Sequence, residues 1–347
     1  MNCFKEKIDN CEKILNEFPS KINIENIKKN YKNSKDRIIE IKAELDNSLK
    51  DLINNFSIIL IGSFGRLESS ELSDLDYCIV YEENINESNK KLIKKKVHKN
   101  LNNIFKNKIS CFSDKYKSEI LSDIGGFEDK SMDFTTRILI FLESIPLNEN
   151  GLYNHLIEDL SNIYLEEYIR EEKYPLFLTN EIIRFWRTLC IDYRWKKMEI
   201  QKPWGIRNIK LRFSRKFLCI SSILILIMLF KELITHEDFN KFIHYPSSIK
   251  MIIIYNILEK NSDEFLTKHN KQVLLKYIEK ILLGYNDFLS CISNEVIRKS
   301  LIGLKFEERN ENKHYNELKE KAKDFHNNII NVFDILSKEL IKKYLIF

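Results

Sequence analysis

The stretch SIILIGSFGRLESSELSDLDYCIVY, residues 57–81, decides how the rest of the chain is interpreted. It opens with SIILIG, a short apolar and β-branched run that is typical of a buried strand. The polar segment SFGRLESSE that follows predicts a loop leading into a helical turn. A second strand is predicted over DYCIVY at the end of the stretch. Two strands joined through a Gly-Ser bend therefore form the predicted centre of the fold.

Two acidic residues stand at the start of the second predicted strand. Asp74 and Asp76 are two positions apart, and strand residues at that spacing point to the same side. Two carboxylates that face one point repel each other unless a cation lies between them, and Mg²⁺ prefers oxygen ligands and substrate phosphates. Gly62 lets the backbone approach a bound group closely. Ser63 adds a hydroxyl where a helix begins, which favours an anion. The pattern predicts a site for a metal ion and a triphosphate.

The arrangement of these residues resembles the signature of the nucleotidyltransferase superfamily, which has the polymerase-β-like fold. The stretch GSFGRLESSELSDLDY holds Gly-Ser, a polar spacer, and then Asp, an apolar residue and Asp. The Gly-Arg-x-Glu after Gly-Ser is most similar to the branch that contains the protein-PII uridylyltransferases and their stand-alone bacterial relatives. The alternative interpretation is a solvated β-hairpin with acidic residues at its edge.

The resemblance implies an enzyme that moves a nucleoside monophosphate from an NTP to an acceptor hydroxyl and releases pyrophosphate. Mg²⁺ or Mn²⁺ would be the cofactor, held by Asp74 and Asp76. Ser63 and backbone N–H groups near Gly62 would hold the β- and γ-phosphates, with Arg66 as a charge clamp. The acceptor would be a protein or an RNA such as a tRNA.

The superfamily uses a third carboxylate on a neighbouring strand, and two residues are candidates. The run RILIFLES, residues 137–144, predicts a buried strand with Glu143 near its end. A lone buried acid needs a partner, and a metal ion would supply one. The segment TTRILIFLESIPL also resembles the stretch after the metal motif in the stand-alone relatives, so Glu143 is preferred as a metal ligand. Asp133 is the other candidate, and its alternative role is that of a helix or turn cap.

Composition indicates a soluble globular protein. The chain has 347 residues, long enough for more than one domain, with 44% hydrophobic and 31% charged residues. Seven cysteines form no CxxC pair, which argues against a disulfide scaffold or zinc site and favours the cytoplasm. The apolar run FLCISSILILIMLF, residues 217–230, is too short to span a bilayer and predicts a buried core helix. No membrane partner is therefore expected.

The pattern along the chain predicts an α+β fold in three parts. Residues 1–55 carry apolar positions at helical spacing and predict N-terminal helices that pack on the core. For residues 56–145, the resemblance implies a small mixed-sheet core of the nucleotidyltransferase type. Within it, residues 82–105 predict an amphipathic helix with an apolar face formed by Leu92, Ile93, Val97, Leu101, Ile104 and Phe105. Residues 146–347 predict a larger, all-helical C-terminal domain.

A basic window lies in the predicted C-terminal domain. Residues 184–216 hold eleven Lys or Arg and two acids, a surplus of positive charge larger than the +5 of the whole chain. The window also holds all three tryptophans. These cations would pair with triphosphate oxygens or a nucleic-acid backbone, and a Trp would stack on a base. The alternative is an Arg-rich helix pair that is salt-bridged to acidic residues, with Trp in the core. The cofactor-binding candidates are Arg184, Arg187, Lys210, Arg212 and Arg215.

Two other functions stay open at this point. One is the synthesis of a small or cyclic nucleotide signal in bacterial defence. The other is a non-catalytic nucleotide-binding regulatory module. Protein PII itself is not the expected acceptor, because the enzymes that modify it carry phosphohydrolase and regulatory domains for which this chain has no room. The histidines are scattered without ligand spacing, so neither a histidine catalyst nor a zinc site is expected.

Overall fold

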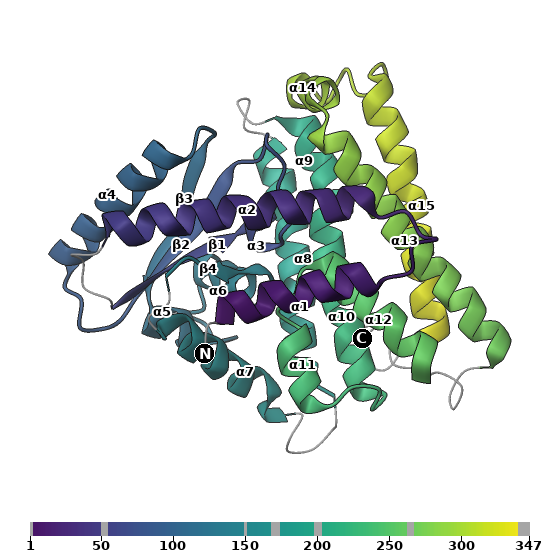
Figure 1. Cartoon of the computed structure of the whole chain (residues 1–347), viewed down its shortest axis with the longest axis horizontal. Helices are drawn as coiled ribbons and strands as arrows, with labels where there is room; N and C mark the ends of the chain where they lie inside the picture. Colours follow the sequence, from purple (N-terminus) through teal and green to yellow (C-terminus); the bar gives the residue numbers. More distant parts are fainter. Residues whose placement is uncertain are drawn as a thin grey trace. The chain divides into compact units, whose positions relative to one another are not determined.

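The computed structural model describes residues 3–49, 55–148, 151–167, 174–197, 203–261 and 267–338 (Figure 1). The protein is α+β, with one mixed sheet and many helices. It has two compact units. The sheet unit comprises Met1–Lys13, Lys29–Glu166 and His244–Pro246, and the helical unit comprises Ile14–Lys28, Glu167–Ile243 and Ser247–Phe347. These units do not coincide with the three predicted parts of the chain, and that division stays a prediction.

The sheet is built around the two strands that the sequence predicts. Its strands are β1 (Phe56–Ile61), β2 (Leu75–Tyr81), β3 (Ile109–Tyr116) and β4 (Ile145–Pro146), in the order β3-β2-β1-β4. β1 runs antiparallel to β2 and β4, whereas β2 and β3 are parallel. Every residue of β1 is buried, as its largely apolar sequence predicts. The two central strands therefore place the Gly-Ser bend at one end of a buried hairpin.

Helices precede, connect and follow these strands. They are α1 (Cys3–Glu17), α2 (Glu25–Ser48), α3 (Gly62–Gly65), α4 (Glu87–Ile104), α5 (Lys117–Leu121), α6 (Ser131–Glu143) and α7 (Leu152–Glu167). The predicted N-terminal helices are confirmed over the described residues, and so is the amphipathic helix α4. Its buried residues are Ile93, Val97 and Leu101, while Leu92 is 48% exposed and so lies off the predicted apolar face.

The strand predicted over residues 137–144 is wrong, because most of that segment belongs to helix α6. The helix buries residues on nearly every side, so its apolar run carries no period that distinguishes a helix from a strand. Arg137 is fully buried in α6, where its Nη2 pairs with Asp129 Oδ2 at 2.9 Å and its Nε donates to the Tyr164 hydroxyl at 3.0 Å. As a result, Glu143 is the last residue of a helix and not part of a strand.

The described part of the helical unit contains helices and no strand. They are α8 (Leu176–Lys197), α9 (Trp204–Lys210), the π-helical turn η2 (Leu211–Arg215), α10 (Lys216–Phe230), α11 (His236–Phe242), α12 (Ser247–Asn261), α13 (Lys268–Ser293), α14 (Glu295–Gly303) and α15 (Lys313–Leu336). The helical run Trp204–Phe230 is long and apolar enough to cross a membrane by length and composition alone. However, 78% of its most apolar window is buried inside the protein, which is typical of a core helix and agrees with the prediction for residues 217–230.

Candidate functional site

The Gly-Ser bend is a single helical turn that follows β1 directly. Gly62 starts the turn with a positive φ of 67°. The turn ends in a Schellman motif, in which the Glu68 N–H donates to the Ser63 carbonyl at 2.9 Å and the Leu67 N–H donates to the Phe64 carbonyl at 3.0 Å. The left-handed position of this motif usually holds glycine, but here it holds Leu67, with a φ of 53°. The backbone of the bend is therefore fixed by its own hydrogen bonds.

Asp76 lies against the bend. It pairs with Ile61 in the β1–β2 ladder, and a Cβ at Gly62 would be 3.1 Å from Asp76 Oδ2. The missing side chain at Gly62 thus leaves room for this carboxylate. Asp76 is half-buried, whereas Asp74 is exposed just before β2 begins. The two predicted aspartates therefore lie at the mouth of β2, and Asp76 is next to the bend.

Glu143 also contacts the bend, from the end of α6. Its Oε1 accepts a hydrogen bond from the Gly62 N–H at 3.1 Å. A Cβ at Gly65 would be only 2.0 Å from the Glu143 carbonyl oxygen, so the end of α6 packs directly on the α3 turn. Gly62 is therefore next to both Asp76 and Glu143, and the structure brings these two predicted carboxylates together.

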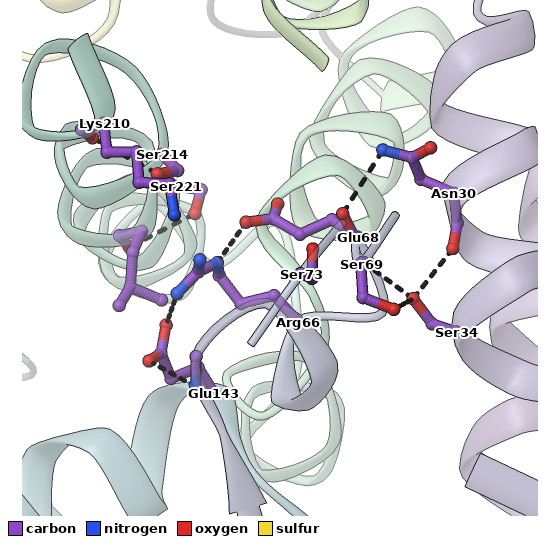
Figure 2. A network of polar contacts seen from close by, with 12 residues as sticks. Asn30, Ser34, Arg66, Glu68, Ser69, Ser73, Glu143, Lys210, Ser214 and Ser221 are labelled. Carbon is purple, nitrogen blue, oxygen red and sulfur yellow. Dashed lines mark hydrogen bonds and ion pairs between the residues drawn. The ribbon is translucent and has the colours of Figure 1, made fainter. Parts of the chain in front are cut away.

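Arg66 lies between two carboxylates in the structure (Figure 2). Its Nε pairs with Glu68 Oε1 and its Nη1 pairs with Glu143 Oε2. The three side chains are 10%, 7% and 2% exposed, respectively. Burial raises the pKa of Glu143, while Arg66 and the Gly62 N–H oppose the rise. Predicted as a clamp for phosphates, Arg66 here bridges two acids of its own chain.

Helix α2 holds the far side of the same loop, and the sequence analysis missed these contacts. The Ser69 N–H donates to Ser34 Oγ at 2.8 Å, and the two serine hydroxyls are 2.8 Å apart. Asn30 Nδ2 donates to the Glu68 carbonyl at 3.3 Å (Figure 2). In the sequence, these contacts are indicated only by Asn30 and Ser34 in a helix that is otherwise rich in Lys and Glu. Asn and Ser occur in helices for many reasons, so they did not predict a contact with this loop.

The other candidate for a third carboxylate lies away from the bend. Asp133 is in the first turn of α6 and pairs with Lys115 at 3.0 Å. Since a helix rises about 1.5 Å per residue, it is roughly 15 Å along the axis from Glu143. Asp114 on the neighbouring strand β3 pairs with Lys94 at 3.0 Å and is in register with Ile79, on the face opposite to Asp76. Glu143 is thus the acid of these three that contacts Gly62.

Asp74 and Asp76 are two carboxylates of the kind that bind a metal ion whose other ligands are substrate oxygens. No group of three or more His, Cys, Asp or Glu side chains among the described residues is arranged to hold a metal ion. Glu143 is already engaged by Arg66 and by the Gly62 N–H. Asp74 and Asp76 could hold Mg²⁺ or Mn²⁺, because Mg²⁺ is commonly bound by one or two carboxylates together with substrate phosphates and water.

The basic window lies in the helical unit, where several of its cations are paired. Arg184 pairs with Glu181 at 3.2 Å, and Arg207 Nη2 lies 3.8 Å from Asp192 Oδ2. Arg187 is exposed on α8, and Lys210 and Arg215 are half-buried. Lys202 lies outside the described residues. These two ion pairs agree with the alternative of an Arg-rich helix pair that is salt-bridged to acidic residues, but only for part of the basic window.

The remaining predicted cation of the window, Arg212, is held by a neutral partner. Its Nε donates to Asn208 Oδ1 at 2.8 Å. The tryptophans differ: Trp204 is buried, Trp186 is half-buried, and Trp195 is 69% exposed. Trp204 is therefore a core residue, as the alternative interpretation expects.

Comparison with known proteins gives no family for this chain. No protein-family model matches it, and no curated protein is significantly similar to it. The resemblance of the Gly-Ser and Asp-x-Asp motif to the nucleotidyltransferases therefore stays a prediction that rests on these residues.

Proposed function

We propose that this chain is a metal-dependent nucleotidyltransferase that moves a nucleoside monophosphate from an NTP to a hydroxyl of a protein or an RNA, with release of pyrophosphate. The observation that carries the proposal is the convergence of Asp76 and Glu143 on Gly62. A second supporting observation is that Asp74 and Asp76 lie at the start of β2, which pairs with β1, the strand before the bend. A cytoplasmic location is part of the same proposal.

Each residue of the bend has a role in this proposal. Asp74 and Asp76 would hold the divalent ion, which when bound neutralises phosphate charge and lowers the pKa of an acceptor hydroxyl. Gly62 leaves room for the Asp76 carboxylate beside the bend, and Ser63 offers its hydroxyl to a phosphate oxygen. Glu143 is a positioning residue, because it accepts the Gly62 N–H and pairs with Arg66. Arg66 keeps the two buried acids beside it neutralised.

The test is nucleotide transfer in the presence and absence of Mg²⁺. Each α-³²P-labelled NTP is incubated with the full chain and cell extract, and the products are treated with protease or RNase. Asp76→Asn should reduce labelling by on the order of 10³-fold, because an electrostatic contact at the reacting centre is lost. Asp114→Asn is the matched control, since it changes the same side chain on the adjacent strand but on the opposite face.

The outcomes separate the acceptors and can refute the proposal. Label that is lost on RNase treatment assigns an RNA, and label that is lost on protease treatment assigns a protein. A labelled product that passes a small-pore filter would instead indicate a small nucleotide signal. Equal labelling by wild type and Asp76→Asn, or no Mg²⁺-dependent labelling with any NTP, contradicts the proposed enzyme.

One observation favours a second candidate, the non-catalytic nucleotide-binding module. Glu143 is engaged by Arg66, so the third carboxylate that the resemblance implies is not presented to a ligand. Under this alternative, equilibrium dialysis would show NTP binding that Asp76→Asn weakens, while the wild type releases no pyrophosphate from any NTP. Pyrophosphate release that depends on Asp76 would exclude the module.

A further inference from the structure

Two cations of the basic window lie together at a π-helical turn. Arg212 belongs to η2 (Leu211–Arg215) and Lys216 is the first residue of α10. Both side chains are half-buried. The pKa of Lys216 is lowered, first by burial and then by the charge of Arg212. Single π-helical turns are frequently found at functional sites. The fold therefore brings two like charges together where solvent screens them only in part.

Arg212 is held in place by a buried network without an acid. Asn208 Oδ1 accepts hydrogen bonds from Arg212 Nε at 2.8 Å and from the Tyr315 hydroxyl at 3.0 Å. Asn208 Nδ2 donates to the Tyr193 hydroxyl at 2.9 Å. Asn208 is 8% exposed and Tyr315 is 3% exposed, so the network is rigidly packed. These contacts fix the guanidinium but leave its charge without compensation from the network.

Lys216 also has neutral neighbours. Its Nζ lies 5.9 Å from the centroid of the Trp186 ring, and burial raises the pKa of the nearby Cys190 thiol, which keeps that group protonated at neutral pH. Across the described ranges of the chain, neither Lys216 nor Arg212 has a carboxylate within ion-pair distance. Arg184 and Arg207 of the same window do pair with acids. The two cations at the π-helical turn are therefore distinct from these neighbours.

A phosphate group is the chemistry that this arrangement fits. A guanidinium offers several N–H donors in one plane, and an ammonium is a compact point charge, a combination that suits phosphate oxygens. Partial burial strengthens both interactions relative to water, and the pre-fixed Arg212 loses little freedom on binding. The adjacent Trp186 ring adds a flat apolar surface of the kind on which nucleobases stack.

We propose that Arg212 and Lys216 form an anion site that binds the phosphate group of a small phosphate-bearing ligand of the nucleotide class, beside Trp186. This proposal does not depend on the carboxylates of the bend and holds whether or not the chain transfers nucleotides.

The test is calorimetric titration of the full chain with inorganic pyrophosphate and, separately, with ATP, in EDTA without divalent ions. EDTA removes the metal ion that the aspartates of the bend would need, so binding reports on the cationic site. Arg212→Gln and Lys216→Met should each weaken binding about 10- to 100-fold, since each removes one charged contact. ATP binding that is tighter than pyrophosphate binding assigns a nucleoside phosphate, and equal binding assigns the phosphate group alone; both support the site.

Two control variants isolate the site. Lys280→Met removes a lysine with a similar aromatic contact, its Nζ lying 5.6 Å from the Tyr277 ring, and it should leave binding unchanged. Asp114→Asn, which changes an acid that lies outside both the bend and the basic window, should also leave metal-free binding unchanged. Denaturant unfolding of each variant confirms that it is folded.

A second readout follows a neighbouring histidine. Burial and the charge of Lys216 lower the pKa of His326. A bound anion offsets that charge, so saturating pyrophosphate should raise the pKa of His326 in NMR titrations of wild type but not of Lys216→Met. The proposal is overturned if neither pyrophosphate nor ATP binds folded wild type at millimolar concentration. Binding by Arg212→Gln and Lys216→Met as tight as wild type also overturns it.

Discussion

Replacing Arg66 with Met should destabilise the sheet unit more than any exposed charge change. The substitution keeps most of the aliphatic stem but removes the guanidinium that pairs with Glu68 and Glu143. These acids are 7% and 2% exposed, so the loss leaves two nearly buried carboxylates without the cation between them. Breaking a buried ion pair from one side costs ~3–5 kcal/mol. We expect a loss of this size in urea unfolding at pH 7.

The loss should also depend on pH in a defined direction. The folded-state pKa of Glu143 is already raised, and Arg66 is the first of the groups that oppose the rise. Without Arg66 the pKa rises further. A carboxyl with a raised folded-state pKa favours the folded state when protonated, so its unfavourable effect is absent below its ordinary pKa of about 4.3 and grows as the pH rises through the folded-state value. The variant should therefore be closest to wild type near pH 4.

Matched variants make this prediction refutable. Arg66→Met/Glu143→Gln removes one buried charge and keeps an acceptor for the Gly62 N–H, so it should recover part of the loss. Lys299→Met breaks an exposed pair with Glu295 and should leave stability almost unchanged. A loss below about 1 kcal/mol for Arg66→Met at pH 7, or one that is unchanged at pH 4, would show that the three side chains do not form a buried ion network.

Two further predictions concern packing and reactivity. Gly65→Ala should lower stability by ~1–3 kcal/mol in urea unfolding, because its Cβ would lie 2.0 Å from the Glu143 carbonyl oxygen and neither backbone position can shift easily. Gly284→Ala is the control, since its Cβ would meet Phe325 at an ordinary 3.5 Å and should not lower stability. Cys11 is fully buried and burial raises its pKa to about 12, so iodoacetamide at pH 8 should label it, by mass spectrometry, only after unfolding; labelling of the native protein at the unfolded rate would refute its burial.

The sequence predicts those elements whose pattern is formed by residues close together in the chain. β1 and β2 have apolar, β-branched runs, and the glycine between them marks the bend. The amphipathic helices, such as α4, follow from apolar residues at helical spacing. The position of Asp76 beside Gly62 also follows, because antiparallel pairing of two consecutive strands brings the end of one opposite the start of the next.

Other elements depend on contacts between distant residues. β3 is an edge strand with mostly half-buried residues, and it forms because β2 offers a parallel partner far away in the sequence. Helix α6 is mistaken for a strand because it is buried on nearly all sides and has no period. The bridging role of Arg66 was not predicted either, since Glu143 approaches it only once α6 is a helix and packs on Gly65.

The hydrogen bond from the Gly62 N–H to Glu143, the last residue of α6, constrains the length of that helix. An α-helix turns by about 100° per residue, so one residue inserted between Arg137 and Glu143 would rotate the carboxylate away from the bend or pull Arg137 from its buried pair with Asp129. Moving either Glu143 or Arg137 would break a buried polar contact. Sequences that share this site should therefore accept insertions in their surface loops but none inside α6.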